Sequence, residues 1–144
     1  MKIYVLGSNS FVKEMVHCKN QLCALGHDGW IHQDYEDHVN GKMQAFIEGA
    51  LPGESADFKR MRNYIRQHYD HIQKSDAVLI VNLEKKGIKN YIGGNCLMEM
   101  GMAYVNNKKI FLLNDIPMQT SYLDEIKAMD PICLSGNLSA IQNL

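Results

Sequence analysis

The sequence predicts a single doubly wound α/β domain, residues 1–144, built on a five-stranded parallel sheet. The length of 144 residues fits one domain. Short apolar runs alternate with segments of helical spacing, as in consecutive strand–helix–strand units. Residues 76–82 read DAVLIVN, an apolar run typical of a central strand that is buried on both faces. By analogy with other small Rossmann-like or flavodoxin-like domains, we expect strand order 2-1-3-4-5.

The first strand, helix and second strand follow from the start of the chain. Residues 2–6 are apolar and end at Gly7, which predicts a buried strand. The residues that can cap the next helix are Ser8, Asn9 and Ser10. Apolar side chains at roughly helical spacing then continue to Gly26, where we expect the helix to end. Residues 27–32 predict the second strand.

Residues 33–55 carry the least regular pattern. They begin with a polar, acidic stretch, and residues 43–51 fit either a short helix or a lid. The whole segment, residues 33–55, fits either a lid or part of an oligomer interface. Ser55 then fits the cap of one long helix through Ser75, because apolar residues recur at spacings of three and four. These apolar residues are Phe58, Met61, Ile65, Tyr69 and Ile72.

The third strand at residues 76–82 is followed by a loop and a second long helix. A turn with Gly93 and Gly94 opens this helix, which runs to about Val105. Its apolar side chains point nearly all round, so we expect the helix to be covered on most sides. The remaining elements are a strand at 109–113, a short helix at 122–129 and an edge strand at 131–134.

The overall composition excludes several classes of function. The net charge of -1 provides no basic stripe, so we expect no nucleic-acid polymer as a partner. No apolar run approaches membrane-spanning length and no leader precedes the first strand, so we expect a cytoplasmic protein without membrane contact. The four cysteines lack CxxC spacing and the six histidines lack an HxxxH pattern, so we expect no metal. Without a Walker loop or a GxGxxG fingerprint, we expect no cofactor.

A ligand site is expected beyond the carboxyl ends of the strands, where the strand order reverses. The first and third strands are neighbours in the expected order, so the turns that follow them should face one crevice. A helix N-terminus, hydroxyl groups and glycines there suit a phosphate or another anion, although the turn at residues 7–10 equally fits a plain strand-to-helix connection. The residues predicted to contact the ligand are Gly7, Ser8, Asn9, Ser10, Asn82, Gly93, Gly94 and Asn95.

Glu99 is the candidate catalytic residue, because it carries the only charge between Lys89 and Lys108. We expect it in the first turn of the apolar helix, where the helix dipole favours the ionised carboxylate and burial opposes it. Such a carboxylate can act as a nucleophile at a sugar anomeric carbon or as a general base. The alternative is structural, since Glu99 follows Cys96 by three residues, the spacing of a capping box.

Three stretches of the chain resemble a known enzyme family. They are residues 2–8 (KIYVLGS), 75–81 (SDAVLIV) and 94–104 (GNCLMEMGMAY), the last followed by KKI at 108–110. Together they resemble the nucleoside 2-deoxyribosyltransferase superfamily, which includes the transferases and the 2'-deoxynucleoside 5'-monophosphate N-glycosidases. The resemblance covers most of the chain in order, and residues 33–55 are the unmatched part.

The resemblance implies a specific activity. A glutamate at the position of Glu99 attacks the anomeric carbon of a deoxyribosyl group and displaces the base, and water or a second base resolves the covalent sugar. A tyrosine at the position of Tyr4 lies near that glutamate, and the turn at Gly7 and Ser8 holds a 5'-phosphate. The implied partners are a small nucleoside or nucleotide and further copies of the chain, in a homodimer or higher homo-oligomer.

The chain departs from the family pattern at two carboxylates. His68 occupies a position where the family often has an aspartate, and residues 87–94 lack the acid that contacts the base in the transferases. On its own, the pattern of His68 fits a surface or packing residue. Asp34, Tyr35 or His32 are candidate substitutes for the missing acids. The departures keep open a second hypothesis, a non-catalytic module of the same fold that senses a nucleotide-like ligand, and a flavodoxin-like carrier is a third.

Overall fold

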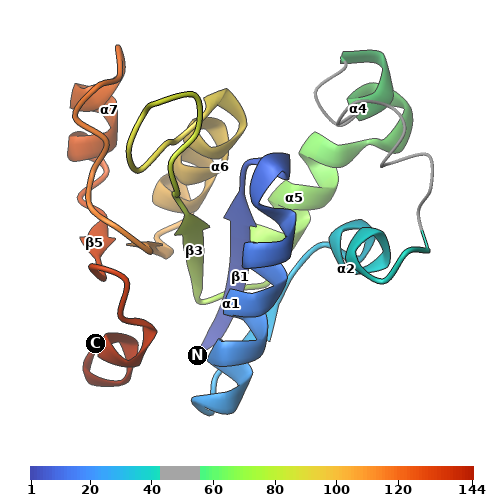
Figure 1. The fold of residues 1–144 in the computed structure, drawn as a ribbon, viewed down its shortest axis with the longest axis horizontal. Helices are drawn as coiled ribbons and strands as arrows, with labels where there is room; N and C mark the ends of the chain where they lie inside the picture. Colours follow the sequence, from blue (N-terminus) through green and yellow to red (C-terminus); the bar gives the residue numbers. More distant parts are fainter. Residues whose placement is uncertain (43–55) are drawn as a thin grey trace.

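The computed structural model describes residues 1–42 and 56–144, and its centre is a five-stranded sheet in which all paired strands are parallel. The strand order is β2-β1-β3-β4-β5, which confirms the predicted order. The strands are β1 (Lys2–Gly7), β2 (Asp28–Trp30), β3 (Ala77–Val81), β4 (Lys109–Leu112) and β5 (Ile132–Cys133). Figure 1 shows β1 and β3 side by side in the middle of the molecule, where the strand order reverses.

Helices cover both faces of the sheet. One face packs against α1 (Val12–Ala24) and the C-terminal 3-10 helix η3 (Leu138–Asn143), and Figure 1 shows α1 in front of β1. The other face packs against α5 (Tyr64–Gln73), α6 (Gly94–Val105) and α7 (Leu123–Ala128). Two apolar clusters result, because alternate residues of each strand point to opposite faces of the sheet.

The turn after β1 positions the start of α1 close to the sheet. Ser8 caps a short 3-10 helix, η1 (Asn9–Phe11), and its Oγ accepts the Ser10 N–H at 3.3 Å. A side chain at Gly7 would crowd the strand end, because a Cβ atom there would lie 2.8 Å from the Sδ atom of Met15 and 3.1 Å from the carbonyl oxygen of Val81. Of the three predicted caps, Ser8 caps η1, whereas the N-cap of α1 itself is Phe11, which makes no side-chain cap hydrogen bond.

The single long helix predicted for residues 55–75 is wrong. Two helices, α4 (Ala56–Arg62) and α5, occupy this part of the chain. Asn63 separates them with φ 55° and ψ 34°, a left-handed conformation that asparagine adopts more readily than most other residues. Ser55, the predicted cap, lies outside the described residues.

The break at Asn63 changes which side of α5 is buried. The buried side chains of α5 are Tyr64, His68 and Ile72. Of the residues predicted to form the buried face, Ile65 is 47% exposed. The helix therefore directs a tyrosine and a histidine inward at positions where the sequence pattern predicts other side chains.

Residues that the sequence pattern leaves undefined form α2 (Gln33–Val39), which packs against α1. His32 caps this helix, since its Nδ1 accepts the Asp34 N–H at 3.1 Å. An ion pair between Lys19 and Glu36 joins the two helices. The helix or lid predicted at 43–51 lies outside the described residues.

The prediction that α6 is covered on most sides is wrong. Its buried side chains are Cys96, Glu99, Met100 and Ala103. In contrast, Tyr104 is 52% exposed and Val105 is 73% exposed, and Met98 is also exposed. The helix therefore has an apolar outer side that other parts of the described chain leave uncovered.

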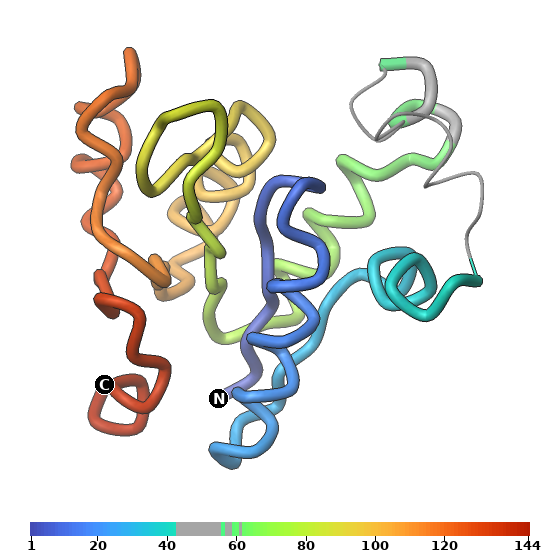
Figure 2. Tube along the Cα trace, viewed as in Figure 1, coloured from blue at the N-terminus to red at the C-terminus, as the bar shows by residue number. Residues whose placement is uncertain are grey.

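The chain termini lie away from the edge of the sheet where the sequence predicts a ligand site. Figure 2 shows both termini at the end of the molecule opposite the carboxyl ends of β1 and β3. None of the helices in the described ranges is both long and apolar enough to cross a membrane.

Candidate active site

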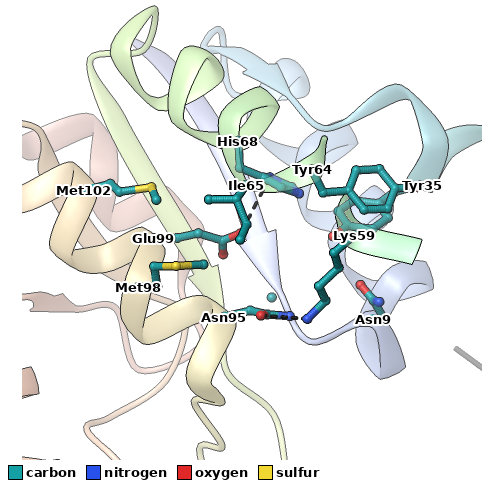
Figure 3. Close-up of a pocket in the computed structure, with 11 residues that line it drawn as sticks. Asn9, Tyr35, Lys59, Tyr64, Ile65, His68, Asn95, Met98, Glu99 and Met102 are labelled. Atoms are coloured by element: carbon teal, nitrogen blue, oxygen red, sulfur yellow. Dashed lines mark hydrogen bonds and ion pairs between the residues drawn. The ribbon is translucent and has the colours of Figure 1, made fainter. Parts of the chain in front are cut away.

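A pocket opens beyond the carboxyl end of β1, between α5 and α6 (Figure 3). The space between its side chains is about 480 Å³ when the open mouth of the pocket is included. Its walls combine the apolar side chains of Ile65, Met98 and Met102 with the aromatic rings of Tyr35 and Tyr64. A pocket of this composition suits a flat ring on its apolar side.

Glu99 projects from α6 into this pocket (Figure 3). The helix begins at Gly94 with Gly93 as its N-cap, so Glu99 lies in the second turn, and its predicted place in the first turn is wrong. The capping-box alternative fails for the same reason, because the N-cap is Gly93 rather than Cys96. Glu99 is only 6% exposed, and its carboxyl group does not cap the helix.

Burial controls the protonation of Glu99. It raises the pKa of the Glu99 carboxyl to about 8, and the nearby charge of Lys59 lowers the pKa by a smaller amount. Glu99 is therefore mostly protonated at neutral pH in the free protein. The helix dipole, on which the sequence prediction of an ionised carboxylate relied, acts mainly on the first turn and is outweighed.

His68 faces Glu99 from α5. Its Nδ1 lies 3.6 Å from Glu99 Oε1 (Figure 3), and the same Nδ1 lies 2.8 Å from the hydroxyl of Tyr4. Burial, with smaller effects of His32 and His71, lowers the pKa of His68 to about 3, so its imidazole is neutral near pH 7. His68 is buried, which fits the packing alternative of the sequence prediction and not the surface one, and its side chain also lines the pocket.

Tyr4 is fully buried on β1, and its hydroxyl is hydrogen-bonded to Nδ1 of His68. Burial raises the pKa of its phenol well above the usual value, and the charge of Glu99 adds to this shift, so the hydroxyl stays protonated. The ring of Tyr4 lies 5.0 Å from that of Trp30, which fixes its position. Tyr4 is thus connected to Glu99 through His68.

A network behind the pocket fixes the ring of Tyr64. Its hydroxyl donates to Asp34 Oδ2 at 2.5 Å, and Arg62 donates to the same oxygen at 2.8 Å. Burial raises the pKa of Asp34, but the hydrogen bonds from Tyr64 and Arg62 outweigh burial and hold it below the usual value. Asp34, Tyr35 and His32 are the candidate substitutes for the missing family acids. Among the described residues, Tyr35 lines the pocket, whereas Asp34 and His32 lie behind it.

A second hollow of about 580 Å³, also open to solvent, adjoins the pocket at the N-terminus of α6. The two spaces share Asn9 and Asn95. Lys85 Nζ donates to Ser8 Oγ at 3.0 Å, and Lys59 Nζ donates to Asn95 Oδ1 at 2.9 Å (Figure 3). The predicted ligand contacts that line one or both spaces are Gly7, Ser8, Asn9, Gly93, Gly94 and Asn95.

Two predicted ligand contacts lie elsewhere. Ser10 is exposed and lines neither space. Asn82 is fully buried, its Nδ2 donates to the Asp115 carbonyl at 2.9 Å, and its Oδ1 accepts the Asn114 N–H at 2.9 Å. These bonds tie the end of β3 to the segment after β4, so the Asn82 amide is structural.

The described part of the chain contains no group of three or more His, Cys, Asp or Glu side chains arranged to hold a metal ion. Its four cysteines are free thiols. Comparison of the chain with protein-family models, with curated proteins and with solved structures gives no match.

Proposed function

We propose that this protein cleaves the N-glycosidic bond of a nucleoside or a nucleoside 5'-monophosphate, with Glu99 as the nucleophile that forms a covalent glutamyl–sugar intermediate. The observation that carries the proposal is the carboxyl group of Glu99, which is buried in a pocket but does not cap its helix. The His68 imidazole, which lies 3.6 Å from this carboxyl group, is neutral and so does not form an ion pair with it. Burial of such a group destabilises a fold, which a catalytic role explains.

The pocket suits both parts of such a substrate. The rings of Tyr35 and Tyr64 and the thioether of Met98 provide apolar contacts for a flat base. The amides of Asn9 and Asn95 provide hydrogen-bonding groups for sugar hydroxyls where the two spaces meet. We place a 5'-phosphate, where the substrate has one, in the second hollow at the N-terminus of α6.

Base release from a substrate panel tests this proposal. Purified protein is incubated with ribonucleosides, deoxyribonucleosides and their 5'-monophosphates, and free base is followed by chromatography. We expect release from at least one compound and a loss of at least about 1,000-fold in Glu99→Gln, because the nucleophile is removed. A new nucleoside formed after addition of a second base identifies a deoxyribosyltransferase, and its absence identifies a hydrolase. Release that is unchanged in Glu99→Gln contradicts the role of Glu99.

The second candidate function is a non-catalytic module that senses a nucleotide-like ligand. The observation in its favour is that burial raises the pKa of Glu99 to about 8, which leaves little ionised carboxylate at neutral pH. The described pocket lining also contains no carboxyl group besides Glu99. Calorimetric binding of a panel member without release of its base identifies this function, and Glu99-dependent release excludes it.

We also propose that the protein assembles into a homodimer or a higher homo-oligomer. The exposed apolar side chains of Tyr104 and Val105 lie on the outer side of α6, the helix that carries Glu99. Burial of this surface against a second copy would remove apolar area from water. Sedimentation velocity at micromolar concentration is expected to give a multiple of 16.4 kDa, and Val105→Asp is expected to shift it toward the monomer. A monomeric wild-type protein contradicts the proposal.

A further inference from the structure

In the proposed reaction the leaving base needs a proton, and few groups in the pocket lining can donate one. The loop before α6, residues 87–94, contains no acid, and Glu99 is the one carboxyl group in the described pocket lining. A base that departs from an anomeric carbon is a poor leaving group unless its nitrogen is protonated. The proton therefore has to come from a group that already lies beside the reacting atoms.

Glu99 and His68 form a buried pair that can hold one proton between them. The Nδ1 of His68 lies 3.6 Å from Glu99 Oε1, and both side chains are less than 9% exposed. The hydroxyl of Tyr4 holds the same Nδ1 at 2.8 Å. Because a phenol oxygen can donate or accept a hydrogen bond, Tyr4 can support this nitrogen both with and without its proton.

We propose, on the basis of the function proposed above, that His68 carries the proton of Glu99 to the leaving base. In the first step the Glu99 oxygen bonds to the anomeric carbon, and the proton of Glu99 moves to Nδ1 of His68. The bond between the anomeric carbon and the base breaks with its electron pair on the base nitrogen. The imidazolium of His68 then gives its proton to that nitrogen and becomes neutral again.

The second step restores the pair. Water, or the nitrogen of a second base, bonds to the anomeric carbon and the ester bond to Glu99 breaks. The proton lost by water returns through His68 to the Glu99 carboxylate. Each turnover thus begins and ends with one proton on the pair, and the leaving base is protonated without a second carboxyl group.

The electrostatic environment favours a single proton on the pair, which Glu99 carries in the free protein. Burial raises the pKa of Glu99 to about 8 and lowers that of His68 to about 3, so the pair holds one proton between these limits. The other groups that face Glu99 are Tyr4, Tyr35, Lys59 and Cys96. The other groups that face His68 are His32, Asp34, Lys59 and His71, together with the rings of Tyr35 and Tyr64. Burial raises the pKa of Tyr4, Tyr35 and Cys96, so these three stay neutral.

The pH dependence of the wild-type enzyme distinguishes a shared proton from a nucleophile that must be ionised beforehand. We expect kcat/KM for base release to be level from pH 5 to about 7 and to fall about tenfold per pH unit above the Glu99 pKa of about 8. Loss of the proton from the pair removes the acid, so alkaline pH lowers the rate. A rate that rises through pH 8 overturns the proposal, because ionised Glu99 is then the active form.

A pair of histidine variants separates proton transfer from structural support. His68→Asn is compared with His71→Asn, which changes the next histidine of α5 without a described contact to Glu99. Each variant is assayed with a nucleoside from the panel and with a nitrophenyl deoxyriboside, whose leaving group departs without a proton. We expect His68→Asn to lose about 100-fold or more on the nucleoside and less than tenfold on the aryl substrate. His71→Asn is expected to change both rates less than tenfold.

The possible failures are distinguishable. Equal losses on both substrates in His68→Asn overturn proton transfer by His68 and leave Glu99 as the nucleophile. Activity on both substrates that persists in Glu99→Gln overturns the proposed function itself, and the role of His68 with it. If His68→Asn does not fold, shown by circular dichroism, the wild-type pH profile alone decides between the two forms of Glu99.

Discussion

Replacement of Glu99 by glutamine is expected to stabilise the protein, and the gain should increase from pH 5 to pH 9. Glutamine has nearly the same shape as glutamic acid but carries no ionisable proton, so it removes the penalty for a buried charge. The same change should abolish base release. A variant that is more stable and inactive is the expected signature of a carboxyl group retained for function.

The direction of the pH effect follows from the change in the Glu99 pKa on folding. The usual pKa of 4.5 applies to the unfolded chain, and burial raises the pKa to about 8 in the native protein. Between these values the native state binds more protons than the unfolded state, so wild-type stability falls as the pH rises. The stability that Glu99 contributes is complete below the unfolded pKa and is lost as the pH rises through about 8. The full difference is on the order of a few kcal/mol.

Urea unfolding of the wild type and Glu99→Gln at several pH values measures this effect. We expect the two proteins to have similar free energies of unfolding at pH 4.5 and the largest difference at pH 9. Glu84→Gln, which changes an exposed glutamate, is the control and should follow the wild type within about 0.5 kcal/mol at every pH. A wild type that is more stable than Glu99→Gln at pH 9 would mean that the ionised carboxylate makes stabilising contacts.

The sheet and the position of the candidate pocket are predictable from the sequence because both follow from strong local patterns. The continuous apolar run that contains β3 has to be buried on both faces, and this places β3 in the centre of the sheet. Polar and glycine residues after β1 and before α6 then meet at the same edge of the sheet. This rule places Asn9, Asn95 and Glu99 in one pocket, as the structure does.

The contribution of α5 to the pocket could not be predicted, because it depends on one backbone conformation. The apolar spacing before Ile72 fits an uninterrupted helix, and no glycine or proline marks a break. Asn63 adopts a left-handed conformation and starts a new helix, so Tyr64 and His68 become the buried residues one turn apart. A weak signal was present, since these two residues and Ile72 recur every four positions.

The protonation of Glu99 could not be predicted because it depends on tertiary burial. The sequence places a lone charge in an apolar helix but does not determine the turn in which the helix begins. A start at Gly94 moves Glu99 to the second turn, away from the helix end and beside His68. Burial rather than the helix dipole then determines the pKa of its carboxyl.

Asn82→Ala is expected to lower the free energy of unfolding by about 2–4 kcal/mol, because it leaves two backbone groups without their partners. The side chain of Asn82 donates to the Asp115 carbonyl and accepts the Asn114 N–H, and it is fully buried. Alanine is too short to reach either group, so both backbone groups lose their hydrogen-bond partner. Urea unfolding at pH 7 measures the loss directly.

The matched variant Asn95→Ala separates this structural role from ligand binding. Asn95 is exposed at the N-terminus of α6, lines both spaces of the site and accepts a hydrogen bond from Lys59. We expect Asn95→Ala to change stability by less than about 0.5 kcal/mol but to weaken binding of the substrate found in the panel. Asn82→Ala should bind that substrate like the wild type under conditions where it is folded. Weaker binding by folded Asn82→Ala would instead assign Asn82 to the ligand site. Its amide would then contribute to ligand binding in addition to its hydrogen bonds with Asn114 and Asp115.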